Sequence, residues 1–127
     1  MLKQDYILRM IEQIIKSLHK LISKDLDPEE IQLVRTDDDL SKTLAQLINL
    51  LDEGRINEAE DQLFDFMDSS DKNCMALALE FYKHLNEFDD KYLESHDFSR
   101  VEVRDGLVSA ARKYGYGSFV DTIISIE

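Results

Sequence analysis

Residues 7–22 decide the fold, and they read Ile7-Leu8-Arg9-Met10-Ile11-Glu12-Gln13-Ile14-Ile15-Lys16-Ser17-Leu18-His19-Lys20-Leu21-Ile22. Apolar residues recur here at alternating steps of four and three, the spacing that keeps side chains on one face of an α-helix. This stripe consists of Ile7, Ile11, Ile14, Leu18 and Leu21. Neighbouring apolar residues widen it to an arc of about 160° at about 100° per residue, a broad amphipathic face. The pattern predicts a helix from Leu2 or Lys3 to about Lys24.

Length and composition favour one helical domain. The chain has 127 residues, which fits a single domain, and 43% apolar residues, which is enough for one compact core. It has four glycines and one proline, whereas all-β proteins use these residues freely in their many turns. We therefore expect a single all-α domain over residues 1–127, with roughly six to eight helices of ordinary length. It divides into an amphipathic N-terminal helix at 1–24 and an acidic helical body at 25–127.

The net charge of −12 is unevenly placed along the chain. Residues 1–24 hold five basic side chains against two acidic ones, a balance of +3. The remaining residues hold ten basic and 25 acidic side chains, a balance of −15. A body this acidic repels phosphate backbones, so we expect no nucleic-acid binding by the domain.

Capping residues predict where the next helices begin. Asp27 and Pro28 indicate the start of a short helix, because aspartate caps free amide groups and proline suits the first helical position. The acidic run at residues 37–39 indicates the start of a helix over about 38–53. Asn57 can cap the helix that follows it.

Further breaks divide the second half of the chain. The polar run at residues 69–71 precedes a helix predicted over about 72–87. Ser99 and Glu102 fit a capping box, which opens a helix that Gly115 ends. Helical spacing also occurs in two further segments, at residues 88–96 and from residue 118 onward.

Residues 47–63 read Leu47-Ile48-Asn49-Leu50-Leu51-Asp52-Glu53-Gly54-Arg55-Ile56-Asn57-Glu58-Ala59-Glu60-Asp61-Gln62-Leu63. Together with their flanks they resemble one tetratricopeptide repeat, over residues 38–68. Gly54 lies where the turn needs a positive φ, and Ala59 lies where two antiparallel helices approach closely. The resemblance implies an αα-hairpin like that of the repeat. The following segment lacks the turn glycine and the small residue, so we expect one such hairpin inside a unique helical domain rather than a repeat array.

The opening stretch Gln4-Asp5-Tyr6-Ile7-Leu8-Arg9-Met10-Ile11-Glu12 resembles the start of a family of short, uncharacterised bacterial proteins. The resemblance implies a match over most of the chain and a bacterial cytoplasmic origin. It implies no activity, because none is established for that family.

Residues that carry catalysis or bind metals occur without the spacing that such sites need. His84 lies four residues after Glu80 and three before Glu87, but one histidine with carboxylates is a poor metal site. Cys74 is the only cysteine and is expected to be a small core residue. No glycine-rich phosphate loop occurs. We therefore expect no catalytic residue, no cofactor and no metal.

Targeting and membrane signals are also missing from the sequence. The opening residues lack the apolar region and the cleavage site of a signal peptide. No apolar run approaches the roughly 20 residues that a membrane-spanning helix needs. A cytoplasmic location is the simplest interpretation.

The first helix has three interpretations. It can be an ordinary core helix, or an interface, since its apolar face is broader than one short neighbour can cover. In the second case a homodimer would form through the candidate interface Ile7, Ile11, Ile14, Leu18 and Leu21. The third interpretation is a helix on a membrane surface, favoured by lysines on the polar face. We expect no membrane binding, because anionic lipids repel the acidic body and the helix has no Trp or Phe.

These observations favour a non-enzymatic protein–protein interaction or scaffold module with an unidentified protein partner. One alternative is a small-molecule binder or small enzyme whose polar groups converge only in the folded chain. The other is peripheral membrane association through residues 2–24.

Overall fold

The computed structural model describes residues 2–25, 38–67 and 73–126. These ranges contain helices and turns but no β-strand, so the predicted all-α class is confirmed. The helices are α1 (Leu2–Asp25), α3 (Asp38–Asp52), α4 (Ile56–Phe66), α5 (Asn73–Asn86), α6 (Asp90–Ser95), α7 (Arg100–Lys113) and α8 (Gly117–Ile126). The helix start predicted at Asp27 and Pro28 and the break predicted at residues 69–71 lie outside the described residues.

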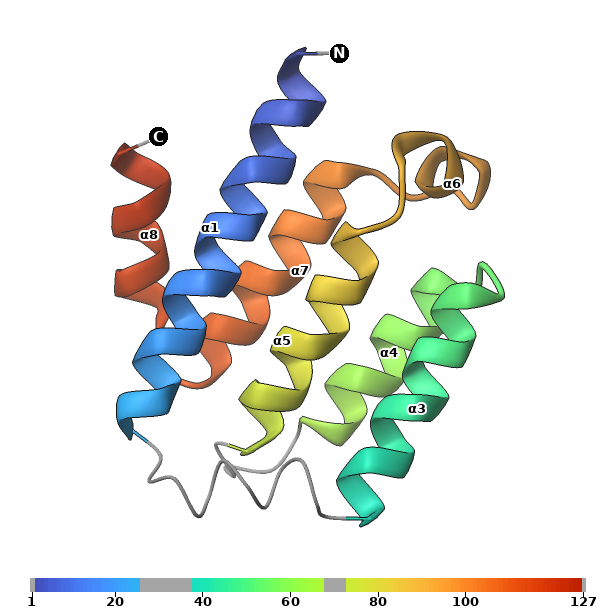
Figure 1. Cartoon of the computed structure of the whole chain (residues 1–127), viewed down its shortest axis with the longest axis horizontal. Helices are drawn as coiled ribbons and strands as arrows, with labels where there is room; N and C mark the ends of the chain where they lie inside the picture. The colour runs from blue at the N-terminus through green and yellow to red at the C-terminus, as the bar shows by residue number, and fades with distance from the viewer. Residues whose placement is uncertain (1, 26–37, 68–72, 127) are drawn as a thin grey trace.

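The longer helices run in alternating directions (Figure 1). Helices α1, α5 and α7 pack against one another, and α8 packs on α7 and α1. The hairpin of α3 and α4 lies on the other side, where α3 packs against α5. The short α6 joins α5 to α7 at the end of the molecule where α1 begins. Helices α1 and α5 are therefore neighbours that run antiparallel.

The apolar stripe of α1 forms part of the core. Ile11, Ile14 and Leu18 are completely buried, Ile7 is 5% exposed and Leu21 is partly buried. Burying one such side chain contributes about 1.5–3 kcal/mol. The broad face is covered because α5, α7 and α8 all contact α1. This burial supports the interpretation of α1 as a core helix, and three helices rather than one short neighbour cover its broad apolar face.

Helices α3 and α4 form the predicted hairpin. Gly54 has a φ of 83°, and the amide of Arg55 donates to the carbonyl of Leu50, which closes the end of α3. Ala59 is completely buried. The predicted cap at Asn57 is wrong: Arg55 occupies the N-cap position without a side-chain cap, and α4 begins at Ile56. Because the chain becomes helical directly after the turn, Asn57 already lies inside the first turn of α4.

A buried arginine holds α5, α6 and α7 together. Arg100 is 2% exposed, and its guanidinium donates to the backbone carbonyls of Asn86 and Phe88, both at 2.8 Å. It also pairs with Asp90 at 2.8 Å. Ser99 caps α7 by accepting a hydrogen bond from the amide of Glu102, as predicted. These contacts fix the C-terminal end of α5, at Asn86.

Candidate functional site

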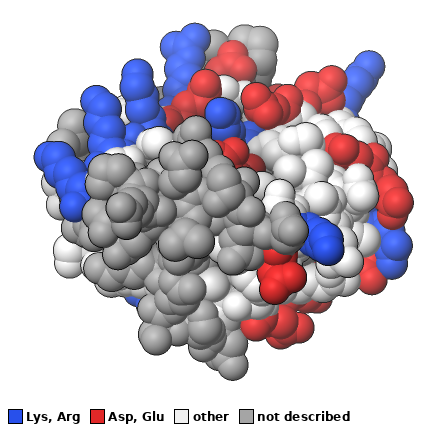
Figure 2. Space-filling view, turned by 60° about the horizontal axis from the view of Figure 1, so that its bottom comes forward, with Lys and Arg blue, Asp and Glu red and all other residues white. Residues whose placement is uncertain are grey.

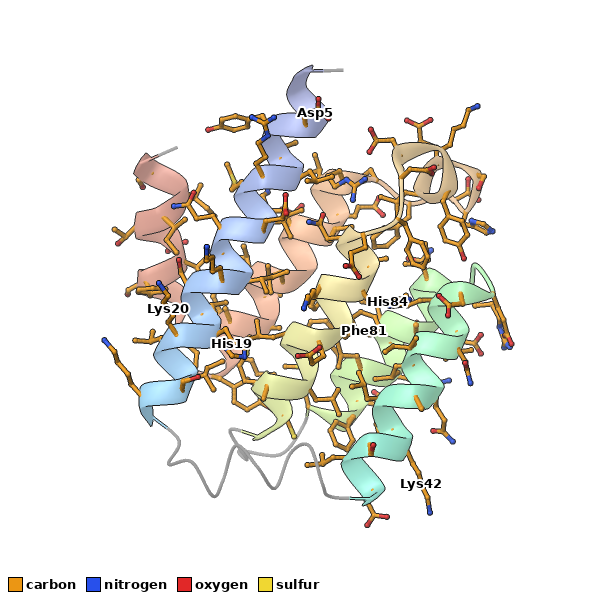
Figure 3. All side chains as sticks on the ribbon, in the orientation of Figure 1. Asp5, His19, Lys20, Lys42, Phe81 and His84 are labelled. Atoms are coloured by element: carbon orange, nitrogen blue, oxygen red, sulfur yellow. The ribbon has the colours of Figure 1, made fainter. Side chains whose placement is uncertain are left out.

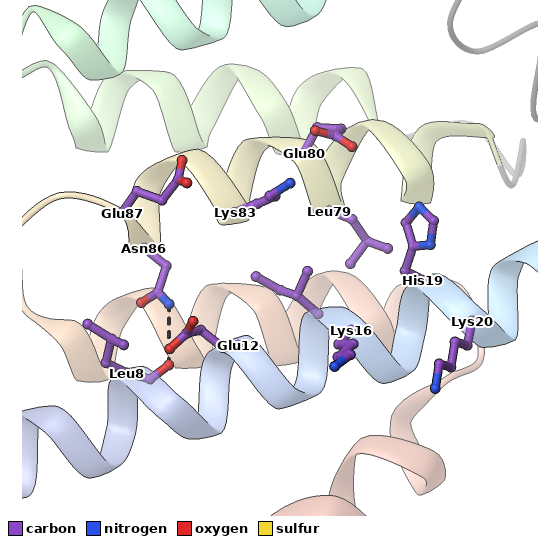
Figure 4. Close-up of a pocket in the computed structure, with 11 residues that line it drawn as sticks. Leu8, Glu12, Lys16, His19, Lys20, Leu79, Glu80, Lys83, Asn86 and Glu87 are labelled. Carbon is purple, nitrogen blue, oxygen red and sulfur yellow. Dashed lines mark hydrogen bonds between the residues drawn. The ribbon is translucent and has the colours of Figure 1, made fainter.

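A groove of about 840 Å³ lies between α1 and α5. Leu8 and Ile15 of α1 are partly buried there, and Leu79 of α5 is 3% exposed. The side-chain amide of Asn86 donates to the backbone carbonyl of Leu8 at 3.3 Å and ties the two helices together at one end (Figure 4). The groove lies along the edge of the α1–α5 contact, where the buried stripe of α1 gives way to its exposed polar residues.

The charged residues of the groove are sorted along its length. Glu12 of α1 and Glu87 of α5 lie toward the end marked by Asn86, whereas His19 and Lys20 lie toward the other end (Figure 4). The walls also carry residues of both signs nearer the middle: Lys16, Glu80 and Lys83. All of these charged side chains are exposed. The groove thus has an apolar floor, an acidic end and a basic end.

The face of the molecule drawn in Figure 2 shows the same charge asymmetry as the sequence. Lysine and arginine side chains gather on the left of Figure 2, the side on which α1 lies in Figure 1, and acidic side chains prevail to the right. The exposed Lys16, Lys20 and Lys24 belong to α1. The groove therefore lies at the border between the basic helix and the acidic body.

A second, smaller depression of about 420 Å³ lies between α4 and α7. Its lining includes Glu60 and Glu102, and Glu60 accepts a hydrogen bond from the hydroxyl of Tyr82 at 2.7 Å. Burial raises the pKa of Glu60, and the nearby charges of Glu102 and Asp61 raise this pKa further. Burial and the charge of Glu60 raise the pKa of Tyr82. The pair is a polar contact inside the fold that joins α4 to α5.

His84 belongs to a cluster on another side of α5 (Figure 3). Its Nε2 lies 2.8 Å from Oδ1 of Asp52, at the end of α3. Its ring packs edge-on against Phe88, which stacks on Tyr92. The hydroxyl of Tyr92 donates to the carbonyl of Leu51. These contacts attach α6 to the α3–α4 hairpin.

No group of three or more His, Cys, Asp or Glu side chains in the described ranges could hold a metal ion. The acidic neighbours of His84 in sequence, Glu80 and Glu87, line the α1–α5 groove instead. Cys74 is buried, as expected of a small core residue.

The structure places the predicted interface residues away from the surface. Four of them, Ile7, Ile11, Ile14 and Leu18, are buried within the single chain, and Leu21 is partly buried. As the chain is folded here, this stripe offers no exposed contact surface. Association through it would require α1 to leave its place, and a homodimer of that kind stays a prediction.

Sequence reasoning missed the residues that α5 contributes to the groove, among them Lys83, Asn86 and Glu87. Periodicity identifies α5 as a helix but does not tell which of its faces lies beside α1. The net positive charge of residues 1–24 was the sequence feature that pointed to this groove, because it distinguished the first helix from the acidic rest of the chain.

Comparisons with known proteins identify a family but no activity. The model of a family of unknown function (DUF6483) matches residues 1–115. This match agrees with the resemblance of the opening stretch to an uncharacterised family. No curated protein and no solved structure matches the chain. Within the described residues, no helix is both long and apolar enough to cross a membrane. Because the match extends over most of its length, the chain belongs to this family of unknown function.

Proposed function

We propose that this chain is a protein–protein interaction module and that the α1–α5 groove is its docking surface. The observation that carries the proposal is the combination of an apolar floor with two walls of exposed charges. Apolar contacts supply affinity in such a site, and surrounding charges select the partner and its orientation.

The dimensions of the groove fit a helical segment. On α1 the lining extends from Leu8 to Lys20, which spans about 18 Å at about 1.5 Å per residue. A partner helix of about three turns has this length. An amphipathic helix that lays its apolar side into a groove is a common mode of recognition between proteins. A partner that fits the groove therefore offers apolar contact area together with charges of both signs.

The distribution of polar groups argues against a small ligand in this groove. Sites for small molecules enclose most of the ligand and direct a few polar groups toward one point. Here the charged side chains are exposed and spread along both walls, from Glu12 to Lys20 on α1 and from Glu80 to Glu87 on α5. This arrangement suits an extended macromolecular surface better than a compact ligand.

Site-specific photocrosslinking in the host cell tests the proposal. A photoreactive amino acid at Glu80, which lines the groove, should give discrete protein adducts. The same group at Gln62, an exposed residue of α4 outside the groove, is the matched control and should give none. Ile15→Glu places a charge on the apolar floor and should remove the adducts of the Glu80 probe, with circular dichroism confirming an unchanged fold. Equal adducts from both probes, or none from Glu80, would refute the docking surface.

The two alternative functions stay predictions. Membrane association through residues 2–24 would require α1 to expose the apolar stripe that now packs on α5, α7 and α8. A small-molecule site would have its best candidate in the depression beside Glu60, where a carboxylate with a raised pKa meets Tyr82. We favour the interaction module because the larger groove combines apolar contact area with charges of both signs.

A further inference from the structure

The lining of the α1–α5 groove differs in charge from the rest of the molecule. It has three carboxylates and three lysines, so its formal charge is zero with His19 neutral: Glu12, Glu80, Glu87, Lys16, Lys20 and Lys83. The whole chain carries −12. Two copies of so acidic a chain repel each other over most of their surfaces. The groove is a face at which a second copy can approach without that local repulsion.

The order of the charges makes this face complementary to itself. The acidic end holds Glu12 and Glu87, and the basic end holds Lys20 beside His19 (Figure 4). A two-fold axis across the middle of the groove places the acidic end of one copy opposite the basic end of the other. In such an isologous interface every contact is made twice. If Glu12 of the first copy pairs with Lys16 of the second, then Lys16 of the first copy also pairs with Glu12 of the second.

We propose that the occupant of the groove is a second copy of this chain, with the two α1 helices antiparallel. This inference rests on the proposed function and names its partner. The exposed ridge of each α1 lies in the α1–α5 groove of the other copy. The partly buried Ile15, between Glu12 and Lys16, supplies apolar contact near the axis. The buried stripe from Ile7 to Leu21 stays in the core of each copy, so neither chain needs to unfold.

The antiparallel arrangement also suits the helices themselves. The positive N-terminal end of one α1 then lies near the negative C-terminal end of the other, which is electrostatically favourable. A parallel arrangement would instead place Glu12 near Glu12 and Lys20 near Lys20. Like charges placed opposite each other at an interface cost several kcal/mol. The charge order therefore selects both the partner and its direction.

Charge-reversal variants of the full chain test this inference. Glu12→Lys with Glu87→Lys makes both ends of the groove basic, and Lys16→Glu with Lys20→Glu makes both ends acidic. All four side chains are exposed, so the fold should persist, with thermal unfolding as the check. Sedimentation equilibrium should give the wild type twice its chain mass of 14.8 kDa. Each double variant alone should associate at least about tenfold more weakly.

Two rescue experiments separate this interface from general electrostatics. An equimolar mixture of the two double variants should form a heterodimer, because a basic groove then faces an acidic one. The quadruple variant exchanges the signs of the two ends of the groove and should self-associate again. A parallel dimer, which would place the acidic ends together and the basic ends together, should not form in the wild type because like charges would face each other.

The outcomes distinguish this inference from the proposed function. A wild type that stays monomeric at about 100 μM overturns the second copy as occupant. Adducts of the Glu80 probe at a mass other than two chains would then preserve the docking groove with a different protein. A dimer that persists in both double variants would place the interface elsewhere and also overturn the inference.

Discussion

Replacing Arg100 with methionine tests how much one buried guanidinium contributes to the junction of α5, α6 and α7. The side chain of Arg100 is 1% exposed. It donates to the backbone carbonyl of Asn86 at 2.8 Å, to the side-chain oxygen of Asn86 at 3.1 Å and to the carbonyl of Phe88 at 2.8 Å. It also pairs with Asp90. Methionine keeps most of the apolar stem and removes every donor.

The expected loss follows from the burial of these acceptors. Both oxygens of Asn86 that face Arg100 are buried, and a buried acceptor without a partner costs about 1–3 kcal/mol. The bonds to Phe88 and Asp90 are only partly buried, so water replaces part of them. Because Arg100→Met leaves two buried acceptors without their donor, we expect it to lower the free energy of unfolding by about 2–5 kcal/mol.

Urea unfolding followed by circular dichroism measures this loss. Arg104→Met is the matched control, because Arg104 lies on the same helix, is 29% exposed and pairs with the neighbouring Asp105. Its substitution should change the free energy of unfolding by no more than about 0.5 kcal/mol. A loss below about 1 kcal/mol for Arg100→Met, or an equal loss in both variants, would refute the role assigned to the buried network.

Three further predictions concern local features of the fold. Folding raises the pKa of Glu60 above its ordinary value of 4.5. Protonated Glu60 therefore stabilises the fold fully below pH 4.5, and this stabilisation is lost as the pH rises through the pKa of the folded state. Glu60→Gln should remove this pH-dependent loss of stability, which chemical unfolding between about pH 4 and pH 8 measures. The same pH dependence in the variant and the wild type would show that Glu60 does not cause it. Gly115→Ala should lower the free energy of unfolding by about 1–2 kcal/mol, because Gly115 has a positive φ. Gly54→Ala should lower it further, because Gly54 also has a positive φ and a methyl group there would meet the ring of His96. Equal shifts in melting temperature would exclude the contact with His96. Ser99→Ala should lower the free energy of unfolding by about 1 kcal/mol, because it removes the N-cap of α7. An unchanged midpoint of urea unfolding would contradict this prediction.

Local chemistry explains why the helices were predictable from the sequence. The stripe from Ile7 to Leu21 needs a partner surface whatever that surface is, so its spacing alone predicts α1. Gly54 and Gly115 end helices because the left-handed region favours glycine, and Ser99 begins one because its side chain accepts a hydrogen bond from a nearby amide. These interactions join residues within about five positions of one another. Asn57 failed as a predicted cap because the turn before it closed earlier than expected.

Long-range packing decided everything that concerns the candidate site. Asn86 reaches the carbonyl of Leu8 across 78 positions in the chain, and no periodic pattern relates those two residues. Which face of α5 meets α1 depends on the combined contacts of α1, α3 and α7 with α5. Only that packing turned the predicted interface stripe into core and brought Glu87 and Lys83 into the same groove as Lys16. Sequence by itself therefore determined the helices, their ends and the contrast between a basic first helix and an acidic body. The tertiary structure determined which faces are buried and where the groove lies, because burial depends on neighbours that are distant in the chain.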